Sequence, residues 1–264
     1  MQKTILITGA TDGIGLQAAK LLTASGHHVL LHGRNPAKLQ KAVEAVRGGD
    51  GRAERYVADL SRMAEVESLA KAVGEKHERL DVLINNAGVF RTTNPVTEDG
   101  LDVRFAVNTI APFLLTRRLL PLLGACGRVI NLSSAAQAPV NLRALAGEVP
   151  LSDNAAYAQS KLALTMWSHA LALSLGKDGP TVVAVNPGSM LGTKMVQEAY
   201  GVAGGDVGIG ADILQRAALS DEFATASGKY FDNDAGRFAR PHPDALDASK
   251  SADVVHAIDA ILAK

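Results

Sequence analysis

Tyr157 and Lys161 stand four residues apart in the segment Tyr-Ala-Gln-Ser-Lys. Ser152, Asp153 and Asn154 precede them, each a residue that can cap a helix, and apolar residues follow at helical spacing. We therefore expect Tyr157 in the first turn of a long helix, with Lys161 on the same face. A neighbouring cation lowers the pKa of a phenol, which suits tyrosine to proton transfer. Alone, the pattern is more typical of a surface pair.

A glycine-rich segment joins the first predicted strand, Lys3 to Thr8, to a helical pattern. Its sequence from residue 9 to 15 is Gly-Ala-Thr-Asp-Gly-Ile-Gly. A strand, glycine-rich turn and helix in this order point backbone N–H groups at a phosphate. Gly9 would allow the tight turn, Gly13 the approach of a pyrophosphate and Gly15 close helix–strand contact. We predict phosphate binding here, although the spacing is looser than G-x-G-x-x-G.

The second predicted strand, His28 to His32, leads through Gly33 and Arg34 to a helical stretch from Ala37 to Val46. In dinucleotide-binding folds the end of this strand faces the adenosine ribose, where a carboxylate selects NAD. Arg34 instead suits a 2′-phosphate, which favours NADP over NAD. The alternative is that Arg34 is only a solvated loop residue.

Further strands and helical patterns alternate along the chain. The other predicted strands are Arg55–Leu60, Asp81–Ile84, Arg128–Leu132, Thr181–Val185 and the short Lys229–Phe231. Helical patterns cover Arg62–His77, Phe105–Leu123, Ala211–Leu219 and Ala252–Leu262, and Arg237–Asp247 is predicted as loop. This alternation predicts an α/β fold, a doubly wound parallel sheet with helices on both faces. Right-handed crossovers would bring the polar motifs at the strand ends to one edge, where ligands bind.

The segment Ser189 to Gly210 mixes apolar residues with many glycines. We interpret it as a mobile apolar flap beside the site, since long loops in compact domains are usually functional or disordered. No linker, repeat or low-complexity tract interrupts the sequence, so we predict a single domain over residues 1–264.

The composition is that of an ordinary globular protein. The chain has 264 residues, 47% hydrophobic and 20% charged, with 27 acidic and 27 basic residues. This balance gives no basic footprint for nucleic acid or anionic membranes. A single cysteine, Cys126, fits a reducing compartment, and no apolar run is long enough to span a bilayer. The seven histidines are scattered, so we predict no metal site. From the single cysteine and the lack of a spanning run, we predict a cytoplasmic protein.

With these motifs assembled, the chain resembles the short-chain dehydrogenase/reductase superfamily over nearly its whole length. The motifs, in order, are Thr8-Gly-Ala-Thr-Asp-Gly-Ile-Gly15, Asn85-Asn-Ala-Gly88, Asn108, Ser133-Ser134, Tyr157-x-x-x-Lys161 and Asn186-Pro-Gly188. It is most similar to the retinol-dehydrogenase-like branch, through Tyr157–Ala163, the Ser-Gly-Lys-Tyr-Phe segment ending at Phe231, and the long stretch between Ser134 and Tyr157. One departure is that Ala135-Ala136-Gln137 stand where that branch often carries a histidine.

The resemblance implies a Rossmann-type fold and four catalytic residues. Tyr157 would exchange a proton with the substrate oxygen, Lys161 would lower the tyrosine pKa and bind the nicotinamide ribose, and Ser134 would hold the substrate oxygen. Asn108 would hold a water that passes protons from Lys161, or would only pin a helix kink. The implied cofactor residues are Gly9, Thr11, Asp12, Gly13, Ile14, Gly15, Arg34, Asp59, Leu60, Asn86, Ala87, Gly88, Tyr157, Lys161, Pro187, Gly188 and Thr193.

These inferences favour an NADP-dependent oxidoreductase, with NAD as the other candidate cofactor, that interconverts a ketone or aldehyde and an alcohol on a fairly apolar small molecule. A regulatory protein that binds NADP without turnover is a second hypothesis, which loss of Tyr157 or Lys161 would have favoured. An epimerase or dehydratase on the same fold is a third. The helices over residues 105–123 and 157–175 could pair with a second subunit, so a homodimer is an expectation, or they could be core.

Overall fold

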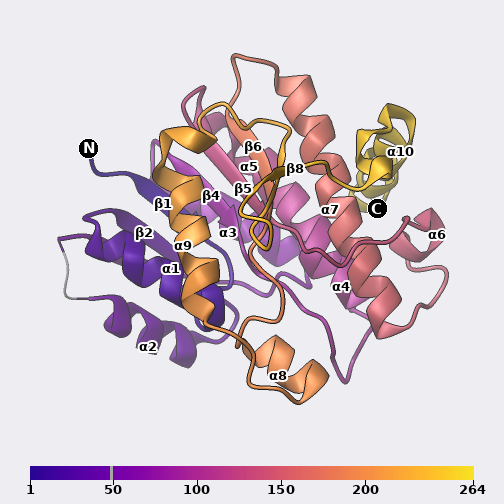
Figure 1. Cartoon of the computed structure of the whole chain (residues 1–264), viewed down its shortest axis with the longest axis horizontal. Coiled ribbons are helices and arrows are strands. Elements are labelled where there is room, and N and C mark those ends of the chain that lie inside the picture. The colour runs from indigo at the N-terminus through magenta and orange to yellow at the C-terminus, as the bar shows by residue number, and fades with distance from the viewer. Residues whose placement is uncertain (48–49) are drawn as a thin grey trace.

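The computed structural model describes residues 1–47 and 50–264. Within them eight strands form one sheet in the order β3-β2-β1-β4-β5-β6-β7-β8 (Figure 1). The strands are β1 (Thr4–Ile7), β2 (His28–Gly33), β3 (Arg52–Val57), β4 (Val82–Asn85), β5 (Arg128–Leu132), β6 (Thr181–Asn186), β7 (Tyr230–Asp232) and β8 (Arg237–Ala239). Strands β1 to β7 pair in parallel, and β8 runs antiparallel to β7.

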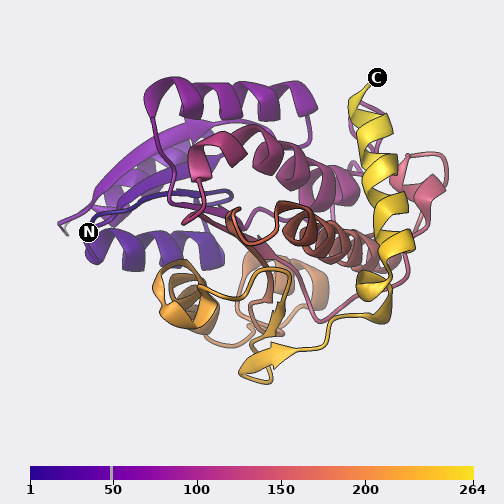
Figure 2. The same ribbon diagram turned by 90° about the horizontal axis from the view of Figure 1, so that it is seen from above.

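Helices cover both faces of this sheet (Figure 2). They are α1 (Gly13–Ala24), α2 (Pro36–Val46), α3 (Met63–Lys76), α4 (Val103–Phe105), α5 (Ala111–Leu123), α6 (Leu142–Leu145), α7 (Asp153–Leu175), α8 (Lys194–Tyr200), α9 (Val207–Leu219) and α10 (Ala248–Leu262). Ile5 and Ile7 of β1 pack with α1, α2 and α9, whereas Leu6 packs with α3 and α5 on the other face. The predicted Rossmann-type, doubly wound sheet is confirmed; its antiparallel edge strand was not predicted.

Two predicted boundaries are wrong at the edges of the sheet. The third strand covers Arg52–Val57 rather than Arg55–Leu60, because its ladder with β2 pairs His28 with Arg52 and ends where Gly33 meets Val57. The strand was predicted too far along the chain because Ala58 and Leu60 are apolar and buried, although both lie beyond the residues that pair with β2. The predicted loop Arg237–Asp247 contains β8 and a 3-10 turn, Pro243–Leu246, since the chain folds back on β7 after residue 232.

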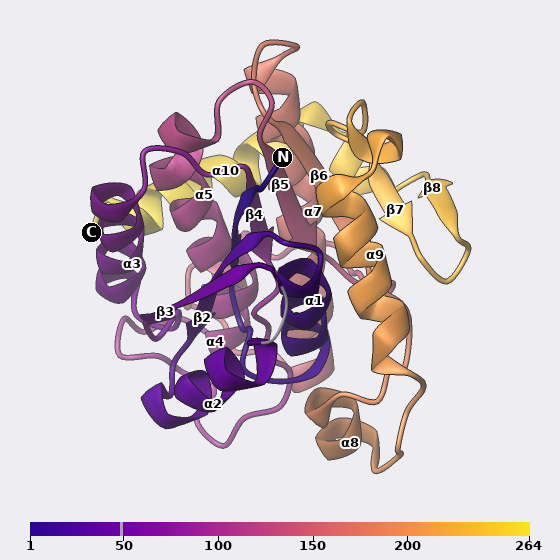
Figure 3. The ribbon, with the colours of Figure 1, turned by 90° about the vertical axis from the view of Figure 1, so that its left-hand side faces the viewer.

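The segment from Ser189 to Gly210, predicted as a loop, contains helix α8 and the first residues of α9. Thr193 caps α8 and Asp206 caps α9, which begins at Val207 and not at Ala211. The ends of the segment close on each other, because Gly192 N donates to the Gly205 carbonyl at 2.7 Å and Gly205 N to the Met190 carbonyl at 2.8 Å. It is therefore a capped helix on a closed loop, standing beside the C-terminal ends of the strands (Figure 3); its mobility stays a prediction.

Helix α10 lies across α7. Its Val254 and Ile258 are buried in one cluster with Phe113 of α5 and Trp167 of α7. The helix begins at Ala248, not at the predicted Ala252, because the Asp247 carboxylate caps it by accepting from Ser249 N and Lys250 N. Most apolar side chains of α7 are thus core between the sheet and α10, whereas Leu173 is exposed, and pairing with a second subunit stays a prediction. In the described ranges no helix is long and apolar enough to cross a membrane. The single domain over 1–264 stays a prediction.

Candidate active site

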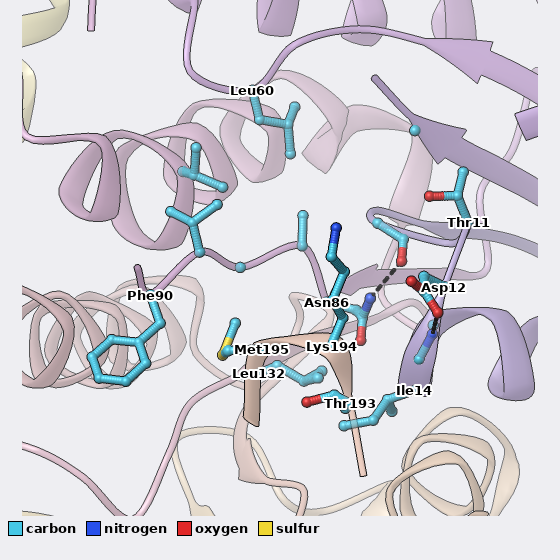
Figure 4. A pocket seen from close by; sticks show the side chains of 18 of the residues that line it. Thr11, Asp12, Ile14, Leu60, Asn86, Phe90, Leu132, Thr193, Lys194 and Met195 are labelled. Carbon is cyan, nitrogen blue, oxygen red and sulfur yellow. Dashed lines mark hydrogen bonds between the residues drawn. The ribbon is translucent and has the colours of Figure 1, made fainter. Parts of the chain in front are cut away.

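A cavity of about 520 Å³ opens at the C-terminal edge of the parallel strands (Figure 4). Its walls come from the segments that follow β1, β2, β3, β4, β5 and β6, as the topology predicts. Its size lies in the range of about 300–1,000 Å³ that is usual for small-molecule and cofactor sites. Figure 4 shows Thr11 and Asp12 at one end and Phe90 at the other, with Thr193 and Met195 between them.

Nearly all the residues predicted to hold a cofactor line this cavity. They are Gly9, Thr11, Asp12, Gly13, Ile14, Gly15, Arg34, Asp59, Leu60, Asn86, Ala87, Gly88, Tyr157, Lys161, Pro187 and Thr193. Gly188 is not part of the lining; a Cβ at this position would point at Leu191. The predicted catalytic residues Ser134 and Asn108 also lie outside the lining, each in contact with residues of the wall.

The glycine-rich loop is held by the loop after β4. The Asn86 side-chain amide donates to the Thr8 carbonyl at 2.8 Å and the Gly9 carbonyl at 3.0 Å. Thr8 Oγ1 accepts from the N–H groups of Asn86 and Ala87, both at 3.0 Å. Gly9 has a φ of +66°, and a Cβ there would stand 2.8 Å from the Ala87 Cα. Only glycine fits this position, which leaves the floor of the cavity to bare backbone.

A buried histidine, not predicted as a site residue, ties the same loop to β2 and β3. His32 Nδ1 accepts from Gly9 N at 3.2 Å, and Nε2 donates to the Ala58 carbonyl at 3.0 Å. Burial lowers the pKa of His32 to about 4, so the ring is neutral at physiological pH. A polar residue within the apolar strand was the signal that could have identified it.

Two cations stand at the start of α2, where the cavity meets the end of β2. Arg34 and Lys38 both line the cavity and both are exposed. Asn35 caps the helix by accepting from Lys38 N at 3.0 Å, so a third source of positive potential, the helix N-terminus, lies at the same place. Lys38 was not predicted; its position four residues after Arg34, in the first helical turn, was the available signal.

Tyr157 and Lys161 face the cavity from α7. Of the three candidate caps, Ser152 caps this helix, which starts at Asp153, so Tyr157 lies in the second turn and not the first. Lys161 is buried and its Nζ donates to the Leu132 carbonyl at 2.7 Å. The same Nζ lies over the Tyr157 ring, 5.7 Å from its centroid. The predicted pair therefore shares one face of the helix and one wall of the cavity.

Burial shifts both pKa values toward the neutral forms. It lowers the pKa of Lys161 to about 8. It also raises the pKa of Tyr157, against a hydrogen bond from Ser134 that acts to lower it. The expected lowering of the tyrosine pKa by Lys161 is thus not found in the chain alone, where the ammonium lies over the ring face. Tyr157 is protonated at neutral pH, which suits a proton donor.

The two serines after β5 have different surroundings. Ser133 is buried, with its hydroxyl 2.7 Å from Thr165 Oγ1 and 3.3 Å from the Lys161 carbonyl. Ser134 is half-buried, and its hydroxyl contacts the Tyr157 phenol and accepts from Ala136 N at 3.1 Å. Only the second serine is thus placed beside Tyr157, which is the arrangement that its predicted role requires.

Asn108 lies in a π-helical turn, Ala106–Ile110, between α4 and α5. Its side chain accepts from Val89 N at 2.8 Å and donates to the Val89 carbonyl and to Ser160 Oγ, both at 3.0 Å. Ser160 Oγ in turn donates to the Tyr157 carbonyl at 2.7 Å. Asn108 therefore links the loop after β4 to the turn of α7 that carries Tyr157. Whether Asn108 holds a water or only pins the helix kink stays a prediction.

Aromatic and apolar side chains form the wall beyond Tyr157. The Phe90 ring centroid lies 4.8 Å from that of Tyr157 and 6.0 Å from that of Tyr200 in α8. Met195 of α8 also lines the cavity. Elsewhere in the described part of the chain, too, no group of three or more His, Cys, Asp or Glu side chains is arranged to hold a metal ion.

A family model described as a short chain dehydrogenase matches residues 3–201. The chain belongs to this family. It is 35% identical to retinol dehydrogenase 13 of Mus musculus, over 93% of this chain and 79% of that protein. It is 36% identical to polyprenol dehydrogenase of Homo sapiens, over 70% of this chain and 60% of that protein.

Among solved structures, this short-chain dehydrogenase is similar to a short chain dehydrogenase from Burkholderia cenocepacia J2315 in complex with NADP. The TM-score is 0.71 at 27% identity, over 87% of this chain and 95% of that chain. The predicted superfamily and its retinol-dehydrogenase-like branch are confirmed, and the chain is an NAD(P)-dependent oxidoreductase that acts on CH–OH or carbonyl groups.

Proposed function

We propose that this enzyme uses NADP to interconvert a ketone or aldehyde and an alcohol on a fairly apolar small molecule, with Tyr157 as the acid and base. The observation that carries the proposal is that Tyr157 and Lys161 line one end of a cavity whose other end is a glycine-rich loop suited to phosphate, with Ser134 in contact with Tyr157 just outside the lining. Proton exchange and cofactor binding thus share one space.

The residues present fit NADP. The positive φ of Gly9 and Gly13 and the absence of a Cβ at both keep the cradle open for a pyrophosphate. Arg34 and Lys38 at the N-terminus of α2 suit a 2′-phosphate, which a carboxylate at this place would repel. The similar Burkholderia enzyme was solved with NADP. Asp59 and Leu60 would lie beside the adenine, Asn86 to Gly88 along its ribose, and Pro187, Gly188 and Thr193 near the carboxamide.

Bound NADP would supply the hydride chemistry, and the chain supplies the proton and the geometry. Tyr157 is neutral at physiological pH; it donates its proton to the carbonyl oxygen during reduction and takes it back during oxidation. Ser134, beside it, orients the same oxygen. Lys161 would bind the nicotinamide ribose, and its positive charge would stabilise the phenolate left after proton donation. Asn108 fixes the turn of α7 that carries Tyr157.

The substrate side of the cavity supports an apolar substrate. Phe90, Met195 and Tyr200 surround the approach to Tyr157 with aromatic and thioether groups. The similar proteins are named for retinol and polyprenol, both apolar alcohols. The predicted cytoplasmic location and homodimer stay predictions.

The test is oxidation of NADPH and NADH with a panel of apolar ketones and aldehydes, comparing wild type with Tyr157→Phe. We expect turnover with NADPH that falls about 10²- to 10⁴-fold in the variant. Tyr56→Phe, which removes a buried phenol bonded to His77 away from the cavity, should leave turnover unchanged. Turnover that survives in Tyr157→Phe, or wild-type protein that binds NADPH and consumes none with any carbonyl, contradicts the proposal.

A further inference from the structure

We infer that the hairpin formed by β7 and β8, residues 230–239, positions both loops of the catalytic end. Asp234 would fix the loop after β6, and Tyr230 the loop after β5. Figure 3 shows this hairpin at the end of the sheet farthest from β3, with β7 beside β6. The inference rests on the proposed function, which gives those two loops their roles.

Asp234, in the hairpin turn, collects the polar groups of the loop after β6. Its carboxylate accepts from Ser189 N at 2.8 Å, from Ser189 Oγ at 2.6 Å and from Asn186 Nδ2 at 2.8 Å. Asn233 adds a bond from its side-chain amide to the Pro187 carbonyl at 2.9 Å. The turn thus holds the chain on both sides of Pro187 and Gly188, the residues proposed to lie against the carboxamide.

The charge of Asp234 is matched to this task. Burial raises the pKa of its carboxyl, but the bonds from Ser189 and Asn186 together lower it below its usual value. An ionised carboxylate has only acceptors, so it can hold several donors at once. An amide at the same position would turn one NH₂ group toward them.

Tyr230, at the start of the hairpin, reaches the other loop. Its ring is buried and its hydroxyl donates to the Ser134 carbonyl at 3.1 Å. Gln137 Nε2 donates to the same carbonyl at 2.8 Å. The backbone of the serine loop is therefore fixed by an amide and a phenol together. The Ser134 hydroxyl is thereby directed toward Tyr157.

Two isosteric variants test this positioning role: Asp234→Asn and Tyr230→Phe. Both keep side-chain volume, so we expect folded protein, with kcat lowered about 10- to 100-fold, as a small misplacement of reacting groups produces. The second readout is binding, measured by calorimetry with NADP and with adenosine 2′,5′-bisphosphate. We expect Asp234→Asn to weaken NADP binding and leave the bisphosphate unchanged, because Pro187 and Gly188 are proposed to contact the nicotinamide half alone.

Matched controls are Asp212→Asn on the exposed face of α9 and Tyr56→Phe on β3, both expected to behave as wild type. Wild-type kinetics and binding in both hairpin variants would overturn the inference. So would an equal loss of affinity for both ligands, since that would indicate general unfolding. Wild-type protein that binds NADP without turnover would refute the proposed function instead, and the difference between the two affinities would still decide the role of Asp234.

Discussion

The two ends of the cavity differ in the kind of groups that line them. The adenosine end is built mainly from backbone, glycine and exposed cations; its residues are Gly9, 11–15, Arg34, Asn35, Lys38, Asp59 and Leu60. The catalytic end, around Ser134, Tyr157 and Lys161, is built from buried and half-buried side chains that bond to groups far away in the sequence. The adenosine end is suited by its shape and positive charge to the phosphate-bearing half of the proposed cofactor. The catalytic end shifts the pKa values of its own groups.

This difference predicts where a substitution acts. At the adenosine end, changes should alter affinity and leave the chemical step intact, because the same contacts exist before and during reaction. At the catalytic end they should alter the rate, because burial and hydrogen bonding there set proton affinities.

The largest effect is expected for Lys161→Met. We expect kcat to fall about 10²- to 10⁴-fold, since the charge that stabilises the phenolate is lost. Affinity for adenosine 2′,5′-bisphosphate should stay at the wild-type value. Steady-state kinetics and calorimetry measure the two quantities, and a parallel loss in both would show that the ends are not separable.

Burial of Lys161 should also be visible in stability. Its folded pKa of about 8 lies below the ordinary 10.5, so between these values the unfolded chain binds more protons than the folded one. The free energy of unfolding of wild type should therefore rise with pH across this window, by up to about 3 kcal/mol relative to Lys161→Met. Urea titrations at several pH values measure it; a constant difference between the two proteins would mean that Lys161 is solvated.

Arg34→Asp replaces a positive charge at the adenosine end by a negative one. We expect the affinity for NADPH to fall about 10- to 100-fold, with kcat at saturation unchanged. Arg240→Asp, at an exposed arginine after β8, is the matched control. If NADPH affinity does not fall, the assignment of this strand end to the 2′-phosphate is wrong.

Gly9→Ala changes the shape of the same end by adding a Cβ where none fits. The added Cβ meets the Ala87 backbone and imposes a positive φ on alanine, so we expect a loss of roughly 1–3 kcal/mol in stability. Weaker binding of NADP should accompany it. Gly100 also has a positive φ, but a Cβ there would meet no other atom. Gly100→Ala therefore measures the cost of backbone strain alone, and the additional loss in Gly9→Ala measures the contact with Ala87.

The adenosine end was the easier part to predict from sequence. Glycines and strand ends are local signals, and Gly9, residues 11 to 15, Arg34 and Asp59 all line the cavity. His32 and Lys38 were missed because neither belongs to a short motif: one is a polar residue within a strand and the other an ordinary helix lysine.

The catalytic end was predicted by residue type and less well by environment. Tyr157 and Lys161 were placed together by helical spacing, but their burial, and with it the pKa of the tyrosine, depends on segments far away in the sequence. The Leu132 carbonyl that holds Lys161 and the Phe90 ring that packs on Tyr157 are such partners. The edge strand β8 was missed for a similar reason: its three residues pair only because the turn after β7 returns them.

The π-helical turn at Ala106–Ile110 makes the length of its segment part of the site. A turn of this kind holds one more residue than an α-helical turn, and Asn108 is at its centre. Removing a residue other than Asn108 from this turn would close it toward a regular α-helical turn and change the direction in which the Asn108 side chain projects. Asn108 would then lose its bonds to Val89 and Ser160 although Ser134, Tyr157 and Lys161 are unchanged. Substitutions here change one side chain, whereas a deletion of a single codon would uncouple α7 from the loop after β4.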